Sequence, residues 1–138
     1  MARTIRWLAA AVLGISVCGG CGDRTPETGI DVDLETPSAT VARFIRAVSD
    51  GDVETYLSLL PTQDRMRAEA SRQAAGEHFD ATLRGSLDSM ERMVAGAEVV
   101  DERISGSTAV VTVRNRAGSD ISWRCVREPD GWKVAVGQ

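Results

Sequence analysis

The order of the periodic segments in this chain predicts an α+β fold, with N-terminal helices packed on a curved antiparallel sheet of about four strands. From residue 36 to residue 96, apolar side chains recur at intervals of three and four, as on one face of a helix. After Gly96 the interval changes to two, which is the period of a strand. Short turns rich in Gly, Ser and Asp separate the later segments, so the strands are expected to follow one another as hairpins.

The first expected helix starts at Thr36 and Pro37. Threonine is a good N-cap, and proline suits the first helical position because no N–H donor is needed there. Gly51 is placed to end this helix in a left-handed conformation. Between these ends the apolar residues share one face, and they are Val41, Phe44, Ile45 and Val48.

Three further helices are expected before Gly96. Asp52 can cap the first of them, and Pro61 ends it because proline cannot continue a helix. Gly76 breaks the chain between the other two. The expected helices cover residues 53–60, a run that starts at Thr62 and includes Ala70, and a run from Glu77 towards Gly96.

Four strands are expected after Gly96, over residues 98–104, 108–114, around 121–125 and around 132–136. In the second strand Ala109, Val111 and Val113 share a face, which makes it the strongest of the four. The alternation in the last strand places Lys133 outward. Asp101 and Glu102 are expected to be solvated at a charged strand end, and Asp120 to act as a cap after a turn.

The N-terminus has the pattern of a secretory signal peptide. Arg3 and Arg6 supply its positive charge, and the uncharged apolar run over residues 7–17 is too short for a spanning helix of about 20 residues. Small residues and then Cys21 follow, which resembles a bacterial lipobox, in which the cysteine receives a diacylglycerol and becomes the new N-terminus. The expected organisation is a signal peptide over 1–20, a flexible tether over 21–35 and a folded domain over 36–138.

Cys21 is the expected lipid attachment site because Gly19 and Gly20 precede it, whereas Val17 precedes Cys18. The alternatives are an ordinary signal peptide cleaved nearby, an uncleaved anchor, or a redox or metal pair formed by Cys18 and Cys21. In the tether, Ile30, Val32 and Leu34 alternate, so a short strand is an alternative there. Lipidation predicts a location in the cell envelope, anchored to a bacterial membrane with the domain facing the periplasm or the exterior.

Charge and composition argue against several functions. The whole chain has a formal net charge of −4, and loss of the two arginines with residues 1–20 makes it about −6. An acidic domain is a poor candidate for nucleic acid. The single histidine and the dispersed acids predict no metal site, and no glycine-rich phosphate loop is present. We therefore expect no cofactor, and a membrane contact made by lipid rather than by charge.

Two stretches resemble a known family. The run from Pro37 to Asp52, with Tyr56 in the next helix, looks like the opening of small bacterial lipoproteins of the nuclear transport factor 2-like superfamily. The tail over residues 105–113 and 126–134, which includes a Gly-Trp-Lys-Val strand, is similar to the same group. The closest group is the domain of unknown function 4878. The resemblance implies a cone-shaped fold with a pocket, and by analogy a homodimer.

If such a pocket exists, its expected lining is Phe44, Tyr56, Trp123 and Cys125. The preferred function is non-catalytic binding of a small apolar ligand or of an envelope protein, with no catalytic residue assigned. The alternative is a small-molecule enzyme like the ketosteroid isomerases or polyketide cyclases, which need a tuned base and an oxyanion donor. The residues available for that chemistry are His78, which we expect to be exposed, Tyr56, and Cys125, which we expect to be a buried thiol.

Overall fold

The structure is a computed structural model that describes residues 36–137. Its elements follow the expected order, with helices first and an antiparallel sheet afterwards, so the α+β fold is confirmed. The helices are α1 (Pro37–Asp50), α2 (Val53–Ser58), α3 (Thr62–Ala75) and α4 (Glu77–Val94). The strands are β1 (Glu98–Ser105), β2 (Thr108–Arg114), β3 (Asp120–Glu128) and β4 (Gly131–Ala135).

Helix α1 is built as its sequence predicts. The Thr36 hydroxyl accepts a hydrogen bond from the Ala39 N–H at 3.1 Å, and Pro37 occupies the first turn. At the other end Gly51 has a φ of 63°, a left-handed conformation that costs glycine little. Val41 and Phe44 are 0 % exposed, so the predicted apolar face is the buried one.

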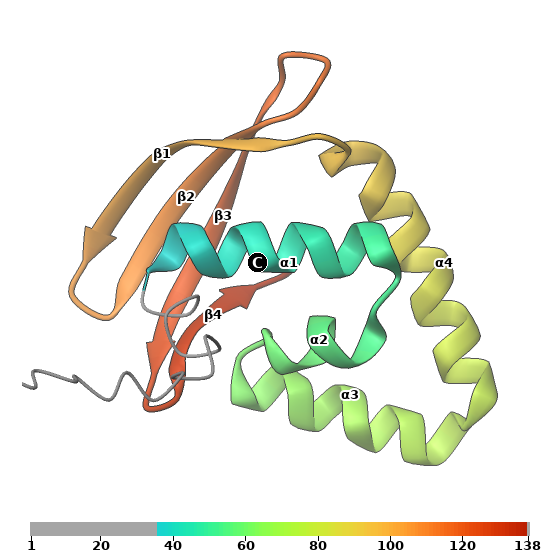
Figure 1. Cartoon of the computed structure of the whole chain (residues 1–138). Coiled ribbons are helices and arrows are strands. Elements are labelled where there is room, and N and C mark those ends of the chain that lie inside the picture. Colours follow the sequence, from blue (N-terminus) through green and yellow to red (C-terminus); the bar gives the residue numbers. More distant parts are fainter. Residues whose placement is uncertain (1–35, 138) are drawn as a thin grey trace, which may run out of the picture.

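The four strands form a meander in the order β1-β2-β3-β4, with every neighbouring pair antiparallel. Figure 1 shows that the sheet is curved and that α1 lies across it, while α4 runs along the side that leads into β1. One irregularity interrupts the β1–β2 register, between Val99 and Asp101. Such a bulge bends a strand and increases its twist.

The core lies between α1 and the sheet, where the inward faces of β2, β3 and β4 meet the apolar face of the helix. Val111, Val113 and Val134 from the sheet are all 0 % exposed. Helix α2 and the residues after it add Tyr56, Leu57 and Leu59 to the same cluster. Helix α3 differs, since none of its residues is buried and it contributes mainly a polar outer surface.

Lys133 lies on the face of β4 opposite Val134, as predicted, but it is buried rather than in solvent. Its side chain is only 5 % exposed, and Nζ donates to the Ser58 carbonyl at 3.0 Å and lies 2.9 Å from the Asp130 carboxylate. The reason is tertiary, because the Val134 N–H donates to the Leu59 carbonyl at 2.8 Å and the segment after α2 therefore runs along the free edge of β4. That segment covers a side chain that strand alternation alone would leave in solvent.

None of the helices in residues 36–137 is long and apolar enough to cross a bilayer.

Candidate functional site

Three aromatic side chains from different elements meet between α1 and the sheet. The Phe44 ring of α1 lies 5.3 Å from the Tyr56 ring of α2 and 5.1 Å from the Trp123 ring of β3, both in tilted arrangements. Phe44 is fully buried and Tyr56 is 7 % exposed, whereas Trp123 is only half-buried. The cluster therefore has a closed end at Phe44 and an open end at Trp123.

An open hollow of about 360 Å³ borders that open end. It forms where β4 stops, because Ala135 pairs with Arg124 and the β3 residues before Arg124 have no partner in β4. Trp123 also has an unusual polar group, since its Nε1 is buried and has no hydrogen-bond partner among residues 36–137. A buried donor without a partner costs about 1–3 kcal/mol. The lining residues of the hollow are Ser122, Trp123, Arg124, Ala135 and Gly137.

Of the residues expected to line a pocket, only Trp123 borders this hollow. Phe44 and Tyr56 lie behind it in the core, and Cys125 is 0 % exposed. Burial raises the pKa of the Cys125 thiol to about 11, and the Glu102 carboxylate adds to the rise. The thiol is therefore protonated at neutral pH, in which form it is a weak nucleophile.

The other two titratable candidates, His78 and Tyr56, differ in their burial. His78 is exposed near the start of α4. Burial raises the pKa of the Tyr56 hydroxyl, with a smaller contribution from Asp64. Within residues 36–137, no group of three or more His, Cys, Asp and Glu side chains is placed to hold a metal ion.

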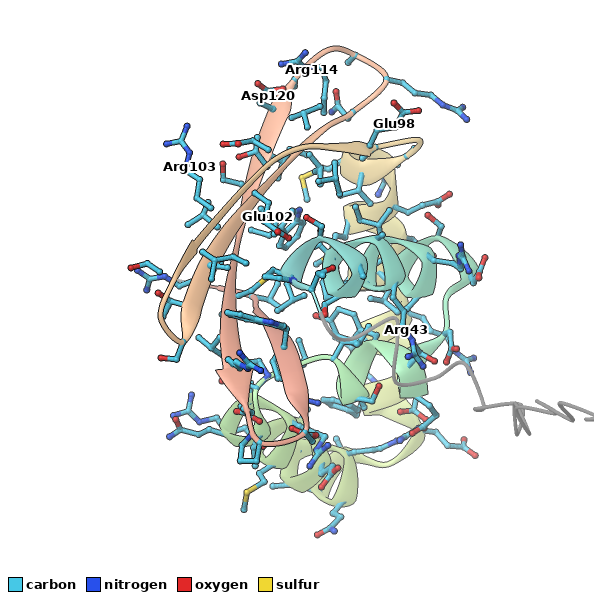
Figure 2. The ribbon with its side chains drawn as sticks, turned by 60° about the vertical axis from the view of Figure 1, so that its left-hand side comes forward. Arg43, Glu98, Glu102, Arg103, Arg114 and Asp120 are labelled. Carbon is cyan, nitrogen blue, oxygen red and sulfur yellow. The ribbon has the colours of Figure 1, made fainter. Side chains whose placement is uncertain are left out.

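Glu102 is a residue whose role the sequence analysis missed. It is half-buried rather than solvated, and its carboxylate accepts hydrogen bonds from the Ser38 backbone N–H at 2.7 Å and from the Ser38 hydroxyl. Figure 2 shows Glu102 beside the start of α1. The carboxylate thus satisfies a free N–H of the first helical turn and complements the helix dipole. Strand alternation is the pattern that could have predicted this position, because Glu102 pairs with the buried Val111 and its side chain therefore faces inward.

The hairpin between β2 and β3 carries a second charged feature. Arg114 donates two hydrogen bonds to Asp120, at 2.7 and 3.0 Å, and these bonds lower the pKa of the Asp120 carboxyl. Both side chains lie at the tip of the molecule in Figure 2. The pair closes the hairpin across its strands, so the capping role expected for Asp120 is replaced by an ion pair.

The family model described as "Domain of unknown function (DUF4878)" matches residues 32–135. The chain belongs to this family. The match confirms the part of the resemblance that named this group, and it covers all eight elements of the fold. Comparisons with curated proteins and with solved structures found no match. The expected signal peptide, the tether and Cys21 lie outside the described residues.

Proposed function

We propose that this DUF4878 protein is a bacterial lipoprotein, anchored through Cys21, whose domain binds a small and largely apolar ligand beside Trp123 without transforming it. The fold is proposed to be a variant of the nuclear transport factor 2-like cone. The order of helices and strands, and the curvature of the sheet around α1, support that relationship.

The N-terminal sequence supports the anchor. The positive start and the short apolar run are features of an export signal, and two small residues precede Cys21 as in a lipobox, with Cys18 at the position where that motif usually has Leu. Several acyl chains on one cysteine provide stable anchoring where a single chain is marginal. Labelling of cells with radioactive palmitate should mark the wild type and Cys18→Ser, and should not mark Cys21→Ser. Labelling that is lost in Cys18→Ser and kept in Cys21→Ser would contradict the assignment.

The hollow beside Trp123 is the observation that supports ligand binding. Its volume of about 360 Å³ lies at the lower end of the range for small-molecule sites. Trp123 offers a large apolar ring backed by Phe44, so the ring is held in place from behind. Its Nε1 is buried, so this donor is not exposed to a ligand in the hollow. The ligand chemistry that fits is a largely apolar body that packs on the Trp123 ring and carries a polar group towards Ser122 or Arg124.

The titratable groups support binding over catalysis. A general base needs a pKa near the working pH and a position within reach of substrate. The Cys125 thiol is buried with a pKa of about 11, and burial also keeps the Tyr56 hydroxyl protonated. Neither residue lines the hollow.

The proposal is tested with anilinonaphthalene sulfonate, a fluorescent probe that has an apolar body and anionic acceptors. Ala135→Leu adds bulk to the lining of the hollow, and Ala117→Leu makes the same change on the exposed β2–β3 turn. The probe should bind the wild type and Ala117→Leu equally, and Ala135→Leu at least about tenfold more weakly. Equal affinity for all three proteins, with unchanged melting temperatures, would place the probe elsewhere and refute the site.

A further inference from the structure

Among the residues that the structure describes, Arg124 is the one charged side chain that lines the hollow. Arg124 pairs with Val110 on one side and with Ala135 on the other, so its side chain lies on the outward face of the sheet, where it is exposed. Trp123 precedes it in β3, and consecutive side chains of a strand point to opposite faces. The Trp123 ring accordingly packs on Phe44 in the core. Because β4 ends here, the hollow borders a cation of one face and an aromatic ring of the other.

From this arrangement we infer that the ligand of the hollow is an amphiphile with an anionic head, whose apolar body packs on Trp123 and whose head is bound by Arg124. The inference deepens the binding function proposed above and rests on it. A guanidinium group binds a carboxylate or a phosphate through two parallel hydrogen bonds, and such charge-assisted bonds are roughly twice as strong as neutral ones. A neutral amphiphile with the same apolar body should therefore bind more weakly than the anion.

Two neighbouring groups can donate further hydrogen bonds to the same head. The Ser122 hydroxyl lines the hollow and lies 3.2 Å from the Thr112 hydroxyl, and when Thr112 donates this bond the Ser122 O–H is left to donate to an anion. The second group is the backbone of β3. Residues 120–123 pair with β2 but not with β4 in the described part of the chain, and a strand edge of this kind presents unpaired N–H donors.

Two acids on the outward face of the sheet are each paired with a different arginine. The Asp101 carboxylate lies 2.9 Å from Arg103, and the Asp120 carboxylate lies 2.7 Å from Arg114. Figure 2 shows the second pair at the tip of the molecule, and Arg103 pointing away from its body. Neither carboxylate lines the hollow, so neither opposes an anionic head beside the Arg124 guanidinium.

The test measures the binding of decanoate and decanol to the full-length protein in phosphatidylcholine nanodiscs by isothermal titration, with empty nanodiscs as the reference. The wild type should bind decanoate at least about tenfold more tightly than decanol. Arg124→Gln should remove this preference by weakening the binding of decanoate alone, and Arg124→Lys, which keeps the charge without the planar fork, should keep part of it. Arg103→Gln is the matched control, because Arg103 lies on the same face across Val110 from Arg124, and it should bind both compounds as the wild type does.

An anionic bilayer lipid has the same kind of head and body as a free fatty acid, and nanodiscs that also contain phosphatidylglycerol distinguish these two sources. An unchanged affinity for decanoate would assign the site to a free ligand. Competition by phosphatidylglycerol that is absent in Arg124→Gln would assign the same anion site to a bilayer lipid.

The outcomes also separate the anionic head from the binding function on which it rests. Equal affinity of the wild type for decanoate and decanol, or a preference for decanoate that survives in Arg124→Gln, would overturn the anionic head. The hollow would remain a binding site in either case if Ala135→Leu weakened the binding of both compounds. Failure of the wild type to bind either compound would overturn the proposed function and this inference together.

Discussion

Phe44 should be the residue whose truncation most damages the domain. It is 0 % exposed at the centre of the α1 face and contacts two other rings, at 5.3 and 5.1 Å. Truncating a buried Phe to Ala costs about 3–5 kcal/mol, and loss of aromatic pairs adds about 0.5–1.5 kcal/mol each. Phe44→Ala should therefore cost about 5 kcal/mol, against a typical total stability of about 5–15 kcal/mol for a domain.

The assay is a thermal melt followed by circular dichroism. At about 4–8 °C per kcal/mol for a domain of this size, Phe44→Ala should lower the melting temperature by at least about 20 °C or leave the domain unfolded. Phe44→Leu keeps most of the volume and should cost less than half as much, which keeps the comparison measurable. Arg46→Ala, on the exposed face of the same helix, should change stability by less than about 0.5 kcal/mol. Equal, small effects for Phe44→Ala and Arg46→Ala would refute the packing of α1 against the sheet.

Three further predictions concern the Cys125 thiol and the Glu102 carboxylate. In the folded protein Cys125 should resist a thiol reagent until denaturant is added, and rapid modification of the native protein would contradict its burial. Burial raises the pKa of this thiol from 9.0 to about 11, so the unfolded state loses its proton first and the stability of the fold decreases as the pH rises between these values. In thermal melts across that pH range, the wild type should lose up to about 2–3 kcal/mol more stability than Cys125→Ala. Parallel stability curves for the two proteins would refute the pKa shift. Glu102→Gln should lower stability by about 1 kcal/mol through its weaker bond to Ser38, whereas Glu98→Gln at the start of β1 should be neutral in the same melts.

Local sequence signals were sufficient to predict most elements of the fold. Thr36, Pro37 and Gly51 bound α1 by the chemistry of their own side chains and backbone, and these preferences act within one helical turn. Strand β2 matches its expected range because its alternation is regular and both of its neighbours are hairpin partners. The family match over residues 32–135 agrees with the resemblance that these same segments suggested.

The features that sequence reasoning missed depend on contacts between distant segments. Lys133 is buried because the residues after α2 run along β4, and Glu102 is held by Ser38, which lies 64 positions away in the chain. The hollow arises because β4 ends before it reaches the start of β3, so its lining depends on the relative lengths of two strands. No sequence pattern around Trp123 indicates this difference in length between β3 and β4. Side-chain periodicity predicts which face a residue takes, but not what covers that face.

Native mass spectrometry of the protein extracted from its own membrane tests the proposed function most directly. The account predicts a chain that begins at Cys21 and carries covalent acyl groups, together with a small, largely apolar molecule that is bound non-covalently and is released by denaturation. Ala135→Leu should lose that molecule and keep the acyl groups, while Ala117→Leu should keep both. A chain that begins elsewhere without acyl groups would contradict the anchor, and an acylated chain with no bound molecule in wild type or Ala117→Leu would contradict the binding site.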